Sequence, residues 1–447
     1  MSGARTLVVG GLGWPHDELA AAALVASGMR ARPLGALDAD ALERGRSVLP
    51  RGQCAPMLYL TGAITRLAAG PSEPADVLAL QSCGPCRYAL FAPEWRRQLD
   101  TMGRTDLRIA QVGQHALELT RWLAGASREL LDALVVADAV VETARRLAPY
   151  AEDPDEVDRE ARALSGRIAE RVARGVPPIR ALREERGWHA GLRRAPLRAL
   201  GRAVVIGEPW SLHVDGDGQL HLPRALARAG VEVEMPPASL WLEYLLWQAG
   251  APPFGRALVD ASTRDAAERL RGQLRDALAA ASDAAGLAAF VLDDVAELEE
   301  LAAPYVSSSI RGGYGHVEIG LAVRARVERR AHVVLSLRSF GCIPSAGITD
   351  GILPAALAGE LPFLSLEVCG DGEAARESRL SLRVAAVLDA AEDELREACA
   401  ARGLDEASAR AISLDPLRGR TGPQRYACTL ASAVAAQREL EGEAAHA

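Results

Sequence analysis

Short runs of apolar residues alternate along this chain with longer segments whose apolar residues recur at helical spacing. The first such run, residues 6–9, ends in glycines and precedes a helical pattern over 17–29 and a strand-like segment at 32–34. This alternation is typical of βαβ units and therefore of a parallel sheet. The same region is predicted to contain helices at 56–69 and 92–102 and strands at 77–80 and 108–112. We therefore predict a first α/β domain over residues 1–120.

The following segment, residues 121–200, contains long helical patterns at 128–149 and 154–174 and no strand-like run, so it is predicted to be a helical connector. Alternation resumes in a second α/β domain over residues 201–390. Its predicted elements are strands at 203–206, 231–235, 333–337 and 362–368 and helices at 220–229, 317–330 and 348–358. Helical patterns at 380–401 and 424–443 are expected to close the chain, with C-terminal helices over 391–447. The predicted fold class is α/β.

Composition excludes several functions. The 447 residues are 49% apolar and carry a formal charge of −8 with both signs interspersed, so no basic face indicates nucleic acid or anionic lipid as a partner. No apolar run approaches the ~18 residues that a membrane span needs, and the start of the chain lacks a secretory pattern, so we expect a cytoplasmic protein. All 51 basic residues are arginine, which excludes lysine Schiff bases and a phosphate-loop lysine.

Four of the seven cysteines lie in turn-like contexts. Cys54 precedes a predicted helix, while Cys83, Cys86 and Cys342 each follow a predicted strand. Ligands bind at the carboxyl ends of parallel strands, and a helix start is expected to lower the pKa of the Cys54 thiol. An odd number of cysteines in a long chain without a secretory pattern disfavours a disulfide framework, so metal binding or thiol chemistry is the question.

The cysteines do not all need a function. Cys399 and Cys428 lie in helical runs and are expected to be buried apolar residues. Cys83 and Cys86 could form a dithiol redox pair or half of a zinc site, but no second Cys-x-x-Cys or paired histidine follows. Thiolates from separate loops, with few histidines, fit an iron–sulfur cluster better than zinc.

Other polar features are interpreted as structural. The glycines at positions 10, 11 and 13 form an incomplete dinucleotide motif, and a plain turn is favoured over a phosphate site. The acidic residues Asp293, Asp294 and 297–300 are expected on a solvated helix face. Three histidines are expected to be ordinary polar residues, two around a loop and one at a helix start: His213, His221 and His316.

Four cysteine-loop and strand motifs in this order resemble the family of 2-hydroxyacyl-CoA dehydratase and benzoyl-CoA reductase subunits. They are Gly52-Gln53-Cys54-Ala55-Pro56, Gly84-Pro85-Cys86-Arg87-Tyr88, Val205-Ile206-Gly207-Glu208-Pro209-Trp210 and Phe340-Gly341-Cys342-Ile343-Pro344. The resemblance covers roughly residues 5 to 390 and is closest to an uncharacterised branch associated with the ATP-dependent activase of these enzymes.

The resemblance implies two or three flavodoxin-like lobes with a [4Fe–4S] cluster in the cleft between them. Carried over motif by motif, it makes Cys54, Cys86 and Cys342 the ligands and leaves one iron open to a small-molecule substrate, as in acyl-CoA dehydratases. It also implies one-electron chemistry at low potential, an actin-like, ATP-dependent activase acting in trans, and a homo- or heterodimer.

Two departures from the family pattern affect this expectation. Cys83 lies three residues before Cys86, and Cys369 stands where relatives tend to have an acidic residue. Either thiol could be a fourth ligand, which would close the cluster and favour electron relay over substrate binding.

Four further residues are expected near the cluster. Glu208 and Arg87 are the candidate catalytic side chains, with Arg87 holding an anionic substrate, tuning the cluster potential or only stabilising its loop. Trp210 and His213 are expected to line the same cleft.

The sequence leaves open whether the chain is an enzyme. The first hypothesis is an iron–sulfur protein that performs or relays low-potential radical or reductive chemistry. The alternatives are a non-catalytic accessory or scaffold subunit and a Cys83/Cys86 dithiol oxidoreductase, whose activity would survive loss of Cys54 and Cys342.

Overall fold

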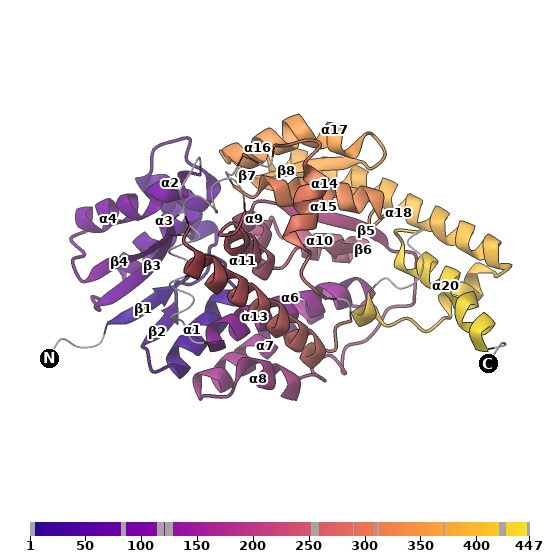
Figure 1. Ribbon diagram of the computed structural model, residues 1–447, viewed down its shortest axis with the longest axis horizontal. Coiled ribbons are helices and arrows are strands. Elements are labelled where there is room, and N and C mark those ends of the chain that lie inside the picture. The colour runs from indigo at the N-terminus through magenta and orange to yellow at the C-terminus, as the bar shows by residue number, and fades with distance from the viewer. Residues whose placement is uncertain are drawn as a thin grey trace.

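The computed structural model describes residues 5–81, 86–113, 120, 128–251, 259–288, 290–307, 309–310, 313–369, 372–419 and 426–444. Two four-stranded sheets, both entirely parallel, lie in different parts of the molecule, with a group of helices between and below them (Figure 1). The protein is therefore of mixed α/β class, as predicted.

The first sheet is formed by the N-terminal part of the chain, in the order β2-β1-β3-β4. Its strands are β1 (Thr6–Val9), β2 (Ala31–Pro33), β3 (Ala75–Gln81) and β4 (Leu107–Gly113). The helical elements between them are α1 (His16–Ala26), α2 (Ala39–Val48), α3 (Ala55–Ala69), the 3-10 turn η1 (Arg87–Leu90) and α4 (Phe91–Thr101).

The second sheet repeats this topology in the order β6-β5-β7-β8. Its strands are β5 (Gly201–Gly207), β6 (Val231–Glu234), β7 (Val333–Ser339) and β8 (Phe363–Val368). The helical elements from β5 to β8 are α9 (Pro209–His213), η3 (Gly216–Gln219), α10 (Leu222–Ala229), α11 (Ala238–Trp247), α13 (Ala261–Ala285), α14 (Val295–Ala302), α15 (Gly315–Val327), α16 (Ile343–Gly347), the π-helical turn η4 (Ile348–Ile352) and α17 (Leu353–Leu357).

In each sheet the first strand along the chain pairs with both the second and the third, so the strand order reverses beside it. Ligands in open α/β sheets bind at the carboxyl ends of the strands next to such a reversal. These ends are the segment after β1 and β3 in one sheet, and the segment after β5 and β7 in the other. All eight predicted strands are present within a few residues of their expected positions, so the strand prediction is confirmed.

A helical layer contains α6 (Arg128–Leu147), η2 (Ala148–Tyr150), α7 (Pro154–Ala173) and α8 (Pro178–Glu184). The 25-residue helix α13, which belongs to a later part of the chain, packs against α6 and α8 and shares their buried core, including Val135, Leu164 and Leu278. The helical layer thus combines two segments that are distant in sequence. No helix in the described parts of the chain is both long and apolar enough to cross a membrane.

The C-terminal elements are α18 (Glu373–Arg402), α19 (Glu406–Arg410), η5 (Pro416–Arg418) and α20 (Thr429–Ala444). Helix α18 extends from the second sheet toward the C-terminal end of the molecule, where α20 lies (Figure 1). A Cβ on Gly201 of β5 would lie 2.3 Å from a methyl group of Val387, so this glycine allows α18 to approach the sheet closely.

The acidic segment before and within α14 differs from its prediction. Asp293 is only partly exposed and forms an ion pair with Arg324, whose side chain is 8% exposed, while Asp294 caps α14 by accepting from Ala296 N at 2.8 Å. The interpretation of Asp293 as part of a solvated helix face is therefore wrong, because the buried arginine of α15 requires a carboxylate partner.

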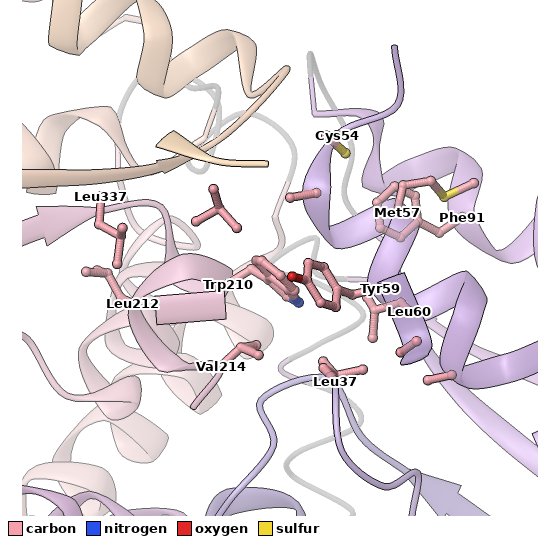
Figure 2. Close-up of a cluster of buried hydrophobic side chains, with 14 of the residues drawn as sticks. Leu37, Cys54, Met57, Tyr59, Leu60, Phe91, Trp210, Leu212, Val214 and Leu337 are labelled. Atoms are coloured by element: carbon pink, nitrogen blue, oxygen red, sulfur yellow. The ribbon is translucent and has the colours of Figure 1, made fainter. Parts of the chain in front are cut away.

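One apolar core joins the two sheets, as Figure 2 shows around Tyr59 and Trp210. These two rings, from α3 and α9, lie 5.4 Å apart between their centroids. Cys54 lies at the start of α3, above this contact in the view of Figure 2. The packing of α3 therefore fixes where Cys54 lies relative to the second sheet.

Candidate functional site

The three cysteines that carry the resemblance share one local geometry. Cys54 is the N-cap residue of α3, Cys86 of η1 and Cys342 of α16, each with an extended backbone. The backbone N–H groups of Met57 and Ser345 donate hydrogen bonds to the thiols of Cys54 and Cys342. The predicted positions of Cys54 at a helix start and of Cys342 after a strand are confirmed, because the glycine and proline residues around them mark these turns.

The structure brings the three cysteine loops together. A Cβ on Gly341, next to Cys342, would lie 3.5 Å from the Cα of Cys54, so these two loops are in contact. The guanidinium of Arg87 donates to the carbonyl of Gly52 at 2.8 Å and thereby joins the Cys86 loop to the Cys54 loop. The Arg87 side chain thus links two loops rather than stabilising only its own.

Glu208 lies at the centre of this neighbourhood. It caps α9, accepting from Trp210 N at 2.9 Å and from Ser211 N at 3.0 Å, and it also accepts from the hydroxyl of Ser339 at the end of β7. Its charge raises the pKa of both Cys54 and Cys342. Burial raises the pKa of Glu208 itself. Glu208 therefore links the ends of β5 and β7 beside the thiols.

The helix start does act to lower the thiol pKa at Cys54, but the expectation that this pKa is low is wrong. Burial raises the pKa of Cys54 to about 11 and that of Cys342 to about 12, and the N–H donors of the helix starts only partly offset this effect. Transfer of a thiolate from water into a largely apolar site costs more than one or two N–H hydrogen bonds return. Unless a metal ion or cluster binds them, these two thiols are protonated at neutral pH.

The remaining cysteines lie elsewhere. Cys369 follows β8 with a backbone φ of +66°, and its thiol is hydrogen bonded to the hydroxyl of Tyr59, more than one turn along α3 from Cys54. Cys399 and Cys428 are buried in the apolar cluster between α18 and α20, as expected. Cys83 lies outside the described residues.

Glu318 was not identified from the sequence. It lies fully buried on α15, where it accepts a hydrogen bond from Ser345 at 3.0 Å, and burial raises its pKa to about 7. Ser345 in turn contacts the Cys342 thiol, so Glu318 is one residue removed from the cysteine site. An acidic residue within the apolar pattern of residues 317–323 was the available signal.

Removal of the Glu208 charge is expected to make the thiols more reactive in the metal-free protein. In Glu208→Gln, the pKa of both Cys54 and Cys342 should fall, because the carboxylate raises both. Alkylation by iodoacetamide at pH 8, followed residue by residue with mass spectrometry, should be several-fold faster at both positions. Glu318→Gln is the matched control and should accelerate Cys342 but not Cys54; equal acceleration of both thiols in the two variants would contradict this geometry.

The backbone N–H groups of the glycine-rich segment after β1 bind the carboxylate of Asp17, in the helix that follows. Asp17 accepts hydrogen bonds from the backbone N–H groups of Gly11 at 3.1 Å, Leu12 at 3.2 Å and Gly13 at 2.8 Å. These donors are the groups that would hold a phosphate in a nucleotide-binding loop. The interpretation as a plain turn is therefore favoured over a phosphate-binding site, because Asp17 already occupies the N–H donors that a phosphate would need.

The Asp17 carboxylate should make stability depend on pH. Burial raises its pKa to about 6, against 3.8 for an ordinary aspartate, so the folded state holds this proton more tightly than the unfolded state. The free energy of unfolding should fall as the pH rises from about 4 to 6, by up to about 3 kcal/mol from this group alone. Urea denaturation at pH 4.5 and 7 should show a smaller difference in Asp17→Asn than in wild type, whereas the exposed control Asp265→Asn should match wild type.

The side chains of Trp210 and His213 lie at two different sites in the structure. Trp210 packs on Tyr59 below Cys54, at the contact between the two sheets. His213 was expected around a loop, but it ends α9, is 7% exposed and lines a different cavity with His16 and Asp138. The expectation that His213 is an ordinary polar residue around a loop is therefore wrong, because α9 directs its ring into the contact with α1 and α6.

Among the described residues, no group of three His, Cys, Asp or Glu side chains is arranged to hold a single metal ion. Comparison with known proteins finds no matching family model and no matching curated protein.

Proposed function

We propose that Cys54, Cys86 and Cys342 hold a [4Fe–4S] cluster, and that the protein performs or relays low-potential one-electron chemistry. The observation that carries this proposal is the meeting of three helix-capping cysteines from loops that lie far apart in the sequence. Structural packing alone does not require a cysteine at all three caps, because serine, threonine, aspartate and asparagine are the usual residues there.

The donor set fits a cluster. A four-iron cluster is larger than a single ion, so thiolates that bind different irons lie further apart than the ligands of one ion. The absence of a single-ion group in the described residues is therefore compatible with this proposal. Soft thiolate ligands from three separate loops, in a sequence with only eight histidines, favour iron–sulfur over zinc binding.

The high pKa values of Cys54 and Cys342 also support a metal-binding role over nucleophilic thiol chemistry. A reactive cysteine needs an accessible thiolate at neutral pH, whereas a buried thiol with a raised pKa is inert until a cation binds it. A bound cluster would supply that positive charge and deprotonate both thiols. Its resident chemistry would be one-electron transfer at low potential.

The residues around the thiols have separate tasks. Met57 N and Ser345 N donate to the sulfurs of Cys54 and Cys342, and such hydrogen bonds raise the reduction potential of a cluster. The buried Glu208 carboxylate acts in the opposite direction and makes reduction harder. Arg87 holds two of the ligand loops in register through Gly52.

We further propose that one iron remains open. Of the two candidates for a fourth ligand, Cys369 is bonded to Tyr59, which disfavours it, and Cys83 lies outside the described residues. An open iron favours direct contact with a small-molecule substrate, such as the acyl-CoA esters implied by the resemblance. The ATP-dependent activase with the actin-like fold would then act in trans as the electron donor.

The proposed function is tested by asking whether an ATP-dependent activase can reduce the cluster. The anaerobically reconstituted protein should be mixed with the activase of a 2-hydroxyacyl-CoA dehydratase system, a reductant and ATP, and examined by EPR. We expect a reduced-cluster signal that requires ATP. A cluster that the activase never reduces would contradict the proposed partner, and a colourless protein would contradict the function as a whole.

A further inference from the structure

Two buried imidazoles, those of His16 and His213, lie where α1 of the first sheet's region and α9 of the second meet helix α6 of the helical layer. His16 begins α1 and is 6% exposed, and His213 ends α9 and is 7% exposed. Their ring centroids are 6.4 Å apart. The Nδ1 atom of His16 and the Nε2 atom of His213 are both buried without a hydrogen-bond partner in the described structure. Buried polar atoms are almost always satisfied, so these two nitrogens indicate a missing partner.

Asp138 of α6 fixes the orientation of the His16 ring. Its carboxylate contacts His16 Nε2 at 3.0 Å and also accepts from the backbone N–H groups of Ala238 and Ser239, each at 2.9 Å. Burial acts to raise the pKa of Asp138, but these hydrogen bonds lower it overall, so the group is a carboxylate. His16 Nε2–H must then donate to Asp138, so Nδ1 is the ring nitrogen of His16 that is left for a ligand.

His16 and His213 line a cavity of about 30 Å³, together with Trp14, Val141 and Arg145. A second cavity of about 70 Å³ shares these three residues and is therefore adjacent. Its other walls are largely apolar and include Ala144, Val157, Val231 and Val233. The combined space has a polar end at the two histidines and an aliphatic end between α6, α7 and β6.

We propose that this cavity binds a short aliphatic alcohol, with its hydroxyl between His16 and His213. A hydroxyl group can both donate and accept a hydrogen bond, so one group can satisfy both His16 Nδ1 and His213 Nε2. Burial lowers the pKa of His213 to about 3, so its ring is neutral and needs no counterion. The aliphatic part of the ligand would fill the larger cavity.

Charge and size exclude other ligand classes. A carboxylate would lie beside the carboxylate of Asp138, and the charge of Arg145 is already balanced by Glu142 at 2.9 Å. An ammonium group would find no uncompensated carboxylate, because Glu142 is paired with Arg145 and Asp138 is bonded to His16 and to two backbone N–H groups. A cavity that holds benzene measures ~150 Å³, so these smaller spaces limit the ligand to about five non-hydrogen atoms.

The test uses the full chain labelled with ¹⁵N and follows the ring nitrogens of the histidines by NMR during titration. 1-Butanol should shift the His16 and His213 resonances saturably, with half-saturation on the order of 1 mM, while sodium butanoate should shift neither. Val141→Phe fills both cavities without removing a nitrogen and should weaken 1-butanol binding at least tenfold. Val327→Phe, at a side chain that is 61% exposed, is the matched control and should bind as wild type does.

His213→Phe should also abolish the shift at His16, and circular dichroism shows whether each variant is folded. A shift that stays linear up to high butanol concentration, an equal response to butanoate, or unchanged binding in folded Val141→Phe would overturn the proposal and leave only water between the two rings. Because the assay needs neither iron nor the cysteines, its outcome is independent of the proposed cluster.

Discussion

Gly62→Ala is expected to lower the free energy of unfolding by about 3 kcal/mol or more. Helices α2 and α3 approach so closely that a Cβ on Gly62 would lie 1.7 Å from the carbonyl oxygen of Ala41. The same contact recurs at Gly45, whose Cβ would lie 1.9 Å from the carbonyl oxygen of Leu58. The clashing atoms belong to the backbone and cannot rotate away, so the helices must separate, and overpacking of this kind costs ~1–3 kcal/mol or more.

The matched control for Gly62 is Gly166, in the interior of α7, where an added Cβ would meet no atom within 4 Å. Gly166→Ala should therefore stabilise the protein by about 0.5–1 kcal/mol through helix propensity alone. Urea denaturation measures both effects. If Gly62→Ala were as stable as wild type, the close crossing of α2 and α3 would be wrong, and with it the placement of Cys54.

The second large effect concerns the cluster. Each of Cys54→Ala, Cys86→Ala and Cys342→Ala is expected to reduce the bound iron after anaerobic reconstitution from about four per chain to nearly none, because two thiolates do not hold a four-iron cluster against loss. The charge-transfer absorption and the EPR signal of the reduced cluster should disappear with the iron.

Two further variants serve as controls. Cys399→Ala removes a buried thiol from the C-terminal core, and Cys369→Ala removes the thiol that is bound to Tyr59. Both should retain the cluster. Loss of the cluster in Cys369→Ala together with retention in Cys86→Ala would show that a different set of three thiols is used. A cluster that survives in Cys54→Ala and Cys342→Ala would contradict this ligand set, whereas thiol–disulfide exchange activity that survives in them would favour the Cys83/Cys86 dithiol hypothesis.

The sequence predicted the strands well because their signals are local. Each strand of the second sheet is a short apolar run bounded by turn residues, and the glycine or proline after it marks the chain reversal. The turns around Cys54 and Cys342 followed from the same signals. The contact between these two loops could not be predicted in this way, since it depends on how α3 packs against α9 through Tyr59 and Trp210.

The sequence predictions failed mainly where they depended on how deeply a side chain is buried. The helix start at Cys54 was correctly predicted, but its thiol pKa depends on desolvation by groups distant in the chain, which no local pattern shows. Likewise, Asp138 is hydrogen bonded to His16, 122 residues earlier in the sequence, and Asp293 forms an ion pair with Arg324 of α15. The partners of these carboxylates are identified only when the tertiary structure is known.

The most direct test of the central claim is the composition and Mössbauer spectrum of the wild-type protein reconstituted with ⁵⁷Fe under anaerobic conditions. We predict about four irons and four sulfides per chain, with one iron site distinguishable from the other three, because three cysteines leave one iron without a protein thiolate. Absence of iron and sulfide after reconstitution, or a single zinc ion in their place, would contradict the account.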